Sequence, residues 1–140
     1  MVILAVDYGD ARTGLAVCDK NEILASAIGT IHERYEPLVI EKIKQTAADY
    51  KAERIVIGKP VNMDGSVGQR AQKCAEFARN LEAETGILCE LYDERMTTMI
   101  AHKSLNMTNT RGKKRKEAVD ALSAQIILQD YIDAKNKKIG

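Results

Sequence analysis

The sequence contains few residues of the kinds that form disulfides or histidine metal sites. Three cysteines and two histidines occur among its 140 residues. Cys18, Cys74 and Cys89 are odd in number and never in a paired spacing, so neither disulfides nor a zinc site are expected, and a reducing cytoplasm is the expected location. His32 and His102 offer little material for a catalytic triad or a histidine-rich metal site, and we expect both to be ordinary surface or packing residues.

Long apolar runs are absent as well, and aromatic residues make up only 4% of the chain. Charged residues interrupt every apolar run before it reaches the length needed to cross a bilayer, which argues against a membrane protein. No basic stretch precedes an apolar segment at the N-terminus, as it would in a secretory signal. The hydrophobic fraction of 45% is ordinary for a globular protein, and we expect one domain over residues 1–140, without linkers or repeats.

The charges nearly balance, with a formal net charge of +1, but they are unevenly distributed. The segment Arg111-Gly112-Lys113-Lys114-Arg115-Lys116 concentrates cations around a flexible glycine, and three more lysines follow at positions 135, 137 and 138. A concentrated basic segment can present a local patch to a polyanion. We interpret the 111–116 segment as such a patch and the later lysines as solvated surface residues.

The hydrophobic pattern predicts an α/β fold built on a mixed five-stranded sheet flanked by helices. The first third of the chain predicts three strands with short turns, which favours an antiparallel meander, and two later strands each follow a helix and should lie parallel to the first. Pro37 is expected to begin the first helix, and Ser66 and Gln69 have the spacing of a capping box for the second. The expected strands are residues 2–6, 13–18, 22–31, 55–57 and 87–92, and a short helix from 97 or 98 to 105 and a final helix over 116–133 complete the pattern.

The first apolar run, Val2 to Val6, ends at Asp7-Tyr8-Gly9. A strand that is apolar at every position is expected to be central and covered on both faces. A carboxylate at its end is costly unless something neutralises it, and Gly9 would allow a tight turn beside that carboxylate. Asp7 therefore either binds a cation, with phosphate as a second guest, or merely opens a hairpin turn, and this segment alone leaves both interpretations open.

Asp120 is a second unusual carboxylate, because it falls in the sheet-facing stripe of the last predicted helix, where an unpaired charge costs several kcal/mol. It either bonds a backbone group near the start of that helix or joins Asp7 and Glu94 at the carboxyl ends of the parallel strands, where ligands of such sheets bind. Three close carboxylates repel one another unless a divalent cation binds them, and oxygen ligands suit Mg²⁺ or Mn²⁺. The stripe comprises Asp120, Ala124, Ile127, Leu128 and Tyr131.

Four short motifs in the sequence, taken together, are specific enough to indicate a protein family. They are Asp7-Tyr8-Gly9 with Arg12 and Gly14, the segment from Gly58 to Gly65 (GKPVNMDG), Asp93-Glu94-Arg95-Met96-Thr97-Thr98, and Val119-Asp120-Ala121. In these motifs and their order, over essentially the full chain, the sequence resembles the YqgF family. Its members are also called RuvX or Holliday-junction-resolvase-like, and they are proposed pre-16S ribosomal RNA nucleases of bacteria. Ala11 and Lys59 are less typical of the family, but neither belongs to the acidic set.

The resemblance implies an RNase H-like fold and metal-dependent phosphodiester hydrolysis. Matched by position, Asp7, Glu94 and Asp120 become the catalytic residues and the ligands of Mg²⁺ or Mn²⁺, with two ions in a two-metal scheme. Asp7 is expected to bridge the ions, and Asp93 is the alternative to Glu94 because sequence does not fix where the strand ends. The expected partners are pre-ribosomal RNA or branched DNA, bound by a monomer or a homodimer in the cytoplasm.

Basic and amide side chains in and near the motifs are expected to contact the nucleic-acid backbone. Arg70 is in the first turn of a predicted helix, where a cation opposes the macrodipole, and either phosphate contact or solvent exposure explains that placement. Tyr8 could stack on a base, although packing is the commoner role of a tyrosine beside a strand end. The full expected substrate-binding set is Arg12, Lys59, Asn62, Arg70, Arg95, Arg111, Lys113 and Lys114.

Two functions of other classes compete with the nuclease. An actin-like or sugar-kinase-like ATP phosphotransferase also has an Asp-x-Gly hairpin beside phosphate, but it generally requires two similar domains, for which 140 residues leave no room. A non-catalytic nucleic-acid-binding module on the same fold is the second alternative, because a fold does not guarantee activity. Holliday-junction resolution usually needs two active sites, and the sequence has no obvious dimer-forming stripe, which favours RNA processing.

Overall fold

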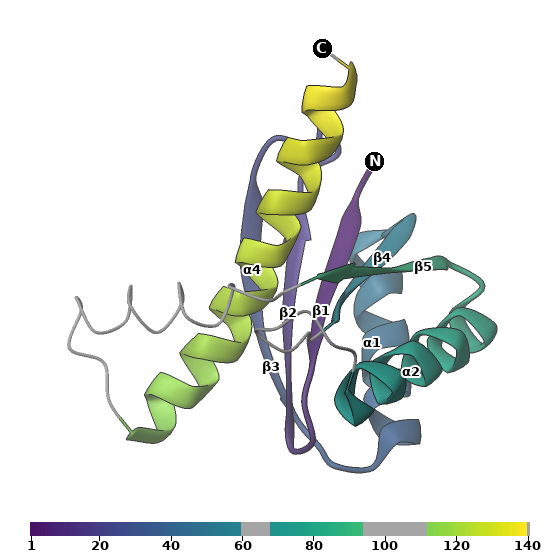
Figure 1. Ribbon diagram of the computed structural model, residues 1–140, viewed down its shortest axis with the longest axis vertical. Coiled ribbons are helices and arrows are strands. Elements are labelled where there is room, and N and C mark those ends of the chain that lie inside the picture. The colour runs from purple at the N-terminus through teal and green to yellow at the C-terminus, as the bar shows by residue number, and fades with distance from the viewer. Residues whose placement is uncertain (60–67, 94–111, 140) are drawn as a thin grey trace.

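The computed structural model describes residues 1–59, 68–93 and 112–139. A five-stranded sheet with the strand order β3-β2-β1-β4-β5 organises this part of the chain (Figure 1). The strands are β1 (Ile3–Tyr8), β2 (Arg12–Cys18), β3 (Ala25–His32), β4 (Arg54–Lys59) and β5 (Leu88–Asp93), and the helices are α1 (Glu36–Tyr50), α2 (Gln69–Thr85) and α4 (Gly112–Ile139).

β1 is the central strand of the sheet. It pairs antiparallel with β2 on one side and parallel with β4 on the other, and β3 and β5 extend the sheet at its two edges. The side chains of residues 3–6 are fully buried, as expected for a strand that is apolar at every position. The predicted mixed sheet, a three-stranded meander followed by two parallel strands, is therefore confirmed.

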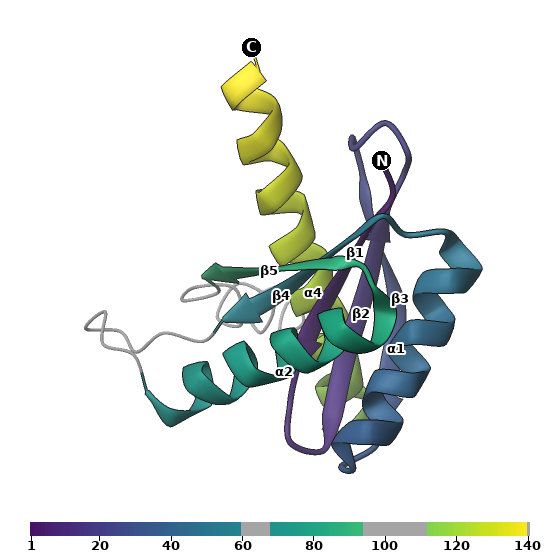
Figure 2. The same ribbon diagram turned by 90° about the vertical axis from the view of Figure 1, so that its right-hand side faces the viewer.

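Helices cover both faces of the sheet, and each face has its own core. α1 and α2 lie in front of the sheet in Figure 2, and α4 lies behind it. Because successive side chains of a strand point to opposite faces, β1 contributes to both cores. Leu4 and Val6 pack with Phe77 of α2, whereas Ile3 and Ala5 pack with the apolar stripe of α4. Each residue of β1 can thus be assigned to one face.

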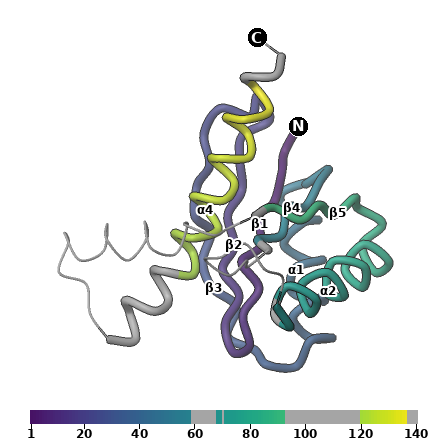
Figure 3. The backbone as a smooth tube through the Cα atoms, viewed as in Figure 1, coloured from purple at the N-terminus to yellow at the C-terminus, as the bar shows by residue number. Residues whose placement is uncertain are grey.

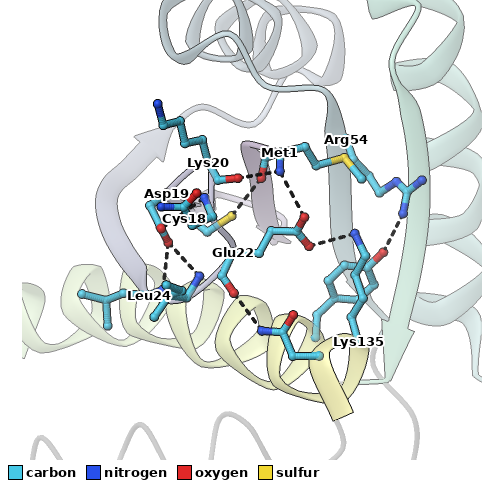
Figure 4. Close-up of polar contacts among 12 residues, drawn as sticks. Met1, Cys18, Asp19, Lys20, Glu22, Leu24, Arg54 and Lys135 are labelled. Atoms are coloured by element: carbon cyan, nitrogen blue, oxygen red, sulfur yellow. Dashed lines mark hydrogen bonds and ion pairs between the residues drawn. The ribbon is translucent and has the colours of Figure 1, made fainter. Parts of the chain in front are cut away.

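α4 runs along β2 and β3 (Figure 3), and polar side chains of its second half bind the turn between those strands. The side-chain amide of Gln129 accepts the N–H of Ala25 at 2.9 Å and donates to the carbonyl of Ile23 at 3.0 Å. Close by, the carboxylate of Glu22 pairs with the ammonium of Lys135 at 2.8 Å (Figure 4). These contacts attach the β2–β3 turn to the helix.

β3 begins at Ala25, three residues later than the predicted strand over 22–31. The cause is Asp19, whose Oδ1 atom accepts the backbone N–H groups of Ile23 at 2.8 Å and Leu24 at 2.9 Å. An aspartate that bonds backbone amides in this way favours a turn over a strand. The turn between β2 and β3 is therefore longer than the hydrophobic pattern predicts.

The helix ends also differ from the predictions. α2 begins at Gln69 after Gly68, which provides no side-chain cap, so the predicted capping box of Ser66 and Gln69 is wrong. α4 covers Gly112–Ile139 and is longer than the predicted 116–133 at both ends. The short helix predicted from 97 or 98 to 105 lies outside the described residues. None of the described helices is long and apolar enough to span a membrane.

Candidate functional site

Asp7 lies within β1, one residue before the strand ends, and it takes part in the ladder opposite Gly14 of β2. It is therefore not a residue that merely opens a turn. Ile3 and Ala5, two and four positions earlier, pack against α4. Because alternate residues of a strand share a face, Asp7 belongs to the face that α4 covers. A half-buried carboxylate thus stands on the face that also receives Asp120.

The backbone of α4 rests on Gly14. A Cβ atom added at Gly14 would lie 2.9 Å from the backbone nitrogen of Ala121 and closer still to the carbonyl group of Asp120. Only a residue without a side chain allows a helix backbone to approach a strand so closely. Since Gly14 is directly opposite Asp7, this contact brings residue 120 next to residue 7.

The Asp120 carboxylate is paired with a cation of β2. Arg12 donates from Nε to Oδ2 of Asp120 at 2.7 Å, a short charge-assisted hydrogen bond that orients the carboxylate. The two side chains are 35% and 18% exposed, so solvent screening limits the energy of the pair. Asp120 therefore contacts a cation from another element of the chain.

The described donors suit a hard divalent cation. Asp7 and Asp120 supply carboxylate oxygens, which Mg²⁺ and Mn²⁺ prefer. Ser123, one turn after Asp120, has a fully buried hydroxyl with no hydrogen-bond partner in the described part of the chain. An unpaired buried hydroxyl costs about 1–3 kcal/mol, a cost that an ion's bound water could remove. Within residues 1–59, 68–93 and 112–139, no three Asp, Glu, His or Cys side chains gather into a group that could hold a metal ion.

Glu94, the third predicted ligand, lies outside the described residues, directly after the end of β5. Its predicted alternative, Asp93, is the last residue of β5. β5 is parallel to β4, which is parallel to β1, so the carboxyl ends of the three strands lie on the same side of the sheet. The chain positions 93 and 94 come at this end of β5, and Asp7 is near this end of β1. Of the three predicted carboxylates, the structure describes Asp7 and Asp120, which share one face of the sheet next to Gly14.

The predicted substrate-binding residues are described to different extents. Arg12 has a described side chain, and it contacts Asp120. Lys59 is the last residue of β4, Arg70 is in the first turn of α2, and Lys113 and Lys114 are in the first turn of α4, so the backbone places them at the ends of elements. The remaining three, Asn62, Arg95 and Arg111, lie outside the described residues.

Tyr8 lies on the opposite face from Asp7 and packs in the core beneath α2. Its ring stacks on Phe77 with 3.8 Å between the ring centroids, and its hydroxyl donates to Glu36 at 3.4 Å. Burial, followed by the negative charge of Glu36, raises the pKa of Tyr8 to about 12. The packing interpretation of Tyr8 therefore holds, and the ring is not presented to a base.

The close approach of α4 to Gly14 is the main feature that sequence reasoning missed. A signal existed, since a glycine inside an apolar strand often marks a close backbone contact. The sequence pattern instead predicts a tight turn at Gly9. Of the described glycines, Gly29 and Gly86 have positive φ angles, so Gly9 does not use the left-handed conformation that favours glycine.

Comparison with known proteins identifies relatives along the whole chain. The family described as RuvX, Holliday junction resolvase, matches residues 1–134. A protein from Desulfitobacterium hafniense is 39% identical over 140 residues, covering 100% of this chain and 97% of the relative. One from Listeria monocytogenes is 36% identical over 138 residues, covering 97% and 100%. Both carry the name of a proposed pre-16S rRNA nuclease.

Solved structures share the fold at low sequence identity. RuvC of Thermus thermophilus in complex with a Holliday junction substrate matches with a TM-score of 0.61 at 13% identity, covering 98% of this chain and 96% of that one. The fowlpox virus resolvase bound to Holliday junction DNA matches with a TM-score of 0.56 at 10% identity, covering 96% and 99%. This likeness confirms the expected RNase H-like fold. Together with the match over residues 1–134 and the relatives at 36–39% identity, it leads to one conclusion: the chain belongs to the RuvX family.

Proposed function

We propose that this protein is a nuclease that requires Mg²⁺ or Mn²⁺ and cleaves phosphodiester bonds of pre-16S ribosomal RNA. The observation that supports the proposal is that the backbone of α4 at Asp120 rests on Gly14, which lies directly opposite Asp7 in the sheet. Arg12 compensates the charge of Asp120 in part, and a divalent cation bound at the site would compensate both carboxylates. The names of the family and of its relatives are consistent with nuclease activity.

Glu94 is the third ligand in this proposal, with Asp93 as the alternative. Along β5, Cys89 packs in the core under α1 and α2, whereas Tyr92 packs in the core under α4. Residues two apart in a strand share a face, and Glu94 follows Tyr92 by two. If the alternation of β5 continues by one residue, Glu94 belongs to the face of the sheet that α4 covers, and this favours Glu94 over Asp93.

The bound ions, two in the proposed scheme, would supply a Lewis acid and an activated water. The chain's part is to hold the carboxylates in place and to bind the substrate backbone. Arg12 uses Nε for Asp120, and its two terminal nitrogens make no hydrogen bond to any described residue, so they can donate to a phosphate. The other proposed phosphate contacts are Lys59, Asn62, Arg70, Arg95, Arg111, Lys113 and Lys114.

RNA is the preferred substrate in this proposal, and branched DNA is the alternative. The relatives at 36–39% identity are named for pre-16S rRNA, whereas the solved structures bound to Holliday junctions are only 10–13% identical. We place the activity in the cytoplasm, where precursor ribosomal RNA is processed in bacteria.

The experiment compares wild type with Asp7→Asn and Asp120→Asn on a pre-16S rRNA transcript and on a four-way DNA junction, with Mg²⁺, Mn²⁺ or EDTA. Both substitutions keep the shape of the side chain but remove the charge that binds the metal. We expect each to lower the cleavage rate by at least about 100-fold and EDTA to abolish it. Asp49→Asn, an exposed aspartate of α1 on the opposite face, is the matched control and should cleave like wild type.

The other outcomes separate the competing functions. Equal cleavage by Asp7→Asn and wild type would refute the assignment of Asp7. Binding of both substrates without cleavage would favour a non-catalytic nucleic-acid-binding module. Cleavage of the junction alone would favour a resolvase, and ATP hydrolysis without nucleic acid would favour a phosphotransferase. Adding Glu94→Gln and Asp93→Asn to the series decides between the two candidates for the third ligand.

A further inference from the structure

We infer that Gly14 is a positioning residue of the acidic site: its missing side chain sets how closely α4 approaches the sheet, and thereby places Asp120 beside Asp7. The inference rests on the proposed function, because it concerns how two metal ligands are held together. Nothing in the chemistry of glycine itself binds an ion. Gly14 acts through the helix that rests on it.

The first argument is steric. A Cβ atom at Gly14 would meet three backbone atoms, the carbonyl carbon and oxygen of Asp120 and, at 2.9 Å, the nitrogen of Ala121. A flexible side chain could move away from an added methyl group, but these are atoms of the helix backbone itself. Any side chain at position 14 must therefore push the third turn of α4 away from the sheet or distort it.

The second argument is the position of Gly14 in the ladder. Gly14 pairs with Asp7 of β1 on one side and with Thr30 of β3 on the other, so the helix crosses the sheet at this row. Directly opposite residues of an antiparallel pair have their Cβ atoms about 4.5–5.5 Å apart on the same face. A helix that touches Gly14 is consequently one strand spacing from the Asp7 side chain.

The third argument comes from neighbouring residues, which allow and use the same close approach. Ala5 and Ala16, paired with each other next to the Asp7–Gly14 pair, are fully buried small residues on the α4 face. Arg12, two residues before Gly14 on β2, reaches Asp120 at 2.7 Å. A shift of α4 away from Gly14 would therefore lengthen the Arg12–Asp120 contact as well as the separation of the two carboxylates.

The test is Gly14→Ala, compared with wild type and with Leu128→Ala. Leu128 is a fully buried residue of α4 in the same helix–sheet interface, two turns after Asp120, and its truncation loosens the packing without adding a spacer at Gly14. We expect both variants to unfold at a lower temperature than wild type. Only Gly14→Ala should bind Mn²⁺ at least about tenfold more weakly, measured by electron paramagnetic resonance of free Mn²⁺ without substrate.

A crystal structure of Gly14→Ala provides a second readout, in which α4 should be displaced at Asp120 and the Arg12–Asp120 contact lengthened. If this variant does not fold, a crystal structure of wild type soaked with Mn²⁺ tests the same point. The ion should contact both Asp7 and Asp120 while Asp120 stays against Gly14. An ion bound by Asp7 without Asp120 would overturn the inference.

The remaining outcomes distinguish this inference from the proposed function. If wild type binds Mn²⁺ and cleaves RNA while Gly14→Ala binds Mn²⁺ equally well, the positioning role of Gly14 is wrong and the nuclease proposal stands. Equal weakening of Mn²⁺ binding in Gly14→Ala and Leu128→Ala would reduce Gly14 to an ordinary packing residue. If wild type neither binds Mn²⁺ nor cleaves, both ideas fall.

Discussion

Asp7 and Tyr8 are neighbours in the sequence, but the alternation of β1 gives them opposite surroundings. Asp7 shares the α4 face with Asp120, whereas the Tyr8 phenol is only 7% exposed, stacked on Phe77 and bonded to Glu36. β1 therefore places the Asp7 carboxylate where a cation could stabilise its charge. It places the Tyr8 phenol where burial disfavours the charged form. For Tyr8 this asymmetry can be measured.

Tyr8 should make the protein less stable at high pH. Burial raises its pKa to about 12 in the folded state from 10.0, the ordinary value expected for the unfolded chain. Below pH 10 both states hold the proton, but between about pH 10 and 12 the unfolded state loses it first. The free energy of unfolding attributable to Tyr8 should therefore fall by up to about 1.4 kcal/mol per pH unit in that window. Urea unfolding of wild type and Tyr8→Phe at pH 9 and 11 measures the difference.

Tyr50→Phe, which removes an exposed phenol of α1, is the control and should keep the full alkaline loss of wild type. Cys89, whose pKa burial raises to about 12 from 9.0, adds to the alkaline loss in every variant and cancels in the comparison. If the unfolding free energy falls equally between pH 9 and 11 in wild type and Tyr8→Phe, the buried environment assigned to the Tyr8 phenol is wrong.

At the scale of elements, α4 carries out two tasks along its length. Near its beginning it brings Asp120 to Gly14, and in its second half Gln129 bonds the backbone of Ile23 and Ala25, where β3 begins. Gln129 provides both a donor and an acceptor to the backbone there, as a neighbouring strand would. Gln125 adds a third bond, from its amide nitrogen to the carbonyl of Ala25 at 3.2 Å.

Gln129→Ala should therefore destabilise the fold more than an ordinary surface substitution. It removes two hydrogen bonds to the backbone of the β2–β3 turn, each with a net value of about 1 kcal/mol, and alanine's better helix propensity returns only a few tenths. We expect a loss of about 1–2 kcal/mol in urea unfolding. Gln45→Ala on α1, where the amide contacts only the exposed Asp49, is the control and should stay within about 0.5 kcal/mol of wild type.

Sequence patterns predicted the elements well where one physical cause dominated. The uninterrupted apolar run of β1 indicated a central strand, and the stripe of α4 indicated a sheet-facing helix, since burial alone decides both. The ends were predicted less well, because they depend on individual side-chain bonds. Asp19 delays the start of β3, and α2 begins after Gly68 without the expected cap.

Sequence patterns single out Asp7 and Asp120 of the candidate site, but they do not predict the contacts of these residues. Asp7 and Asp120 are recognisable because each carboxylate interrupts an apolar pattern. Two contacts have no such local signal: the contact of α4 with Gly14 and the pairing of Arg12 with Asp120. Both depend on how α4 crosses the sheet, although Asp120 is 106 residues after Gly14 in the sequence. No local pattern encodes such a crossing. The assignment of Arg12 to phosphate contact alone was therefore incomplete.

At the scale of the whole molecule, the net charge of +1 is nearly neutral, so we expect nucleic-acid binding to depend on local groups of cations, the 111–116 segment among them. α4 begins within that segment, at Gly112, although cations at a helix N-terminus oppose the macrodipole. A helix start that is unfavourable by itself is understandable if a polyanion compensates it. The segment, residues 111–116, also precedes Asp120 by only about one to two and a half helical turns.

RNA binding should therefore weaken steeply with salt, and the basic segment should account for part of the slope. Replacing Lys113 and Lys114 with alanine removes two phosphate contacts, so the slope of log K against log salt should decrease by about 1.4 for single-stranded RNA. Filter binding between 50 and 200 mM salt measures it. Lys42→Ala with Lys44→Ala, two exposed lysines of α1, should leave the slope unchanged, and an equal decrease in both pairs would assign the effect to net charge instead.

The crossing of α4 over Gly14 also has a consequence for biosynthesis. Asp7 belongs to the first strand to be made, whereas Asp120 is carried by the last helix, which also supplies the apolar stripe that buries Ile3 and Ala5. A growing chain can form the sheet's meander early, but it has no second carboxylate beside Asp7 until α4 is released and folds back onto β2. The acidic site proposed here would thus stay incomplete on a growing chain until the residues of α4 have been made and have folded onto β2.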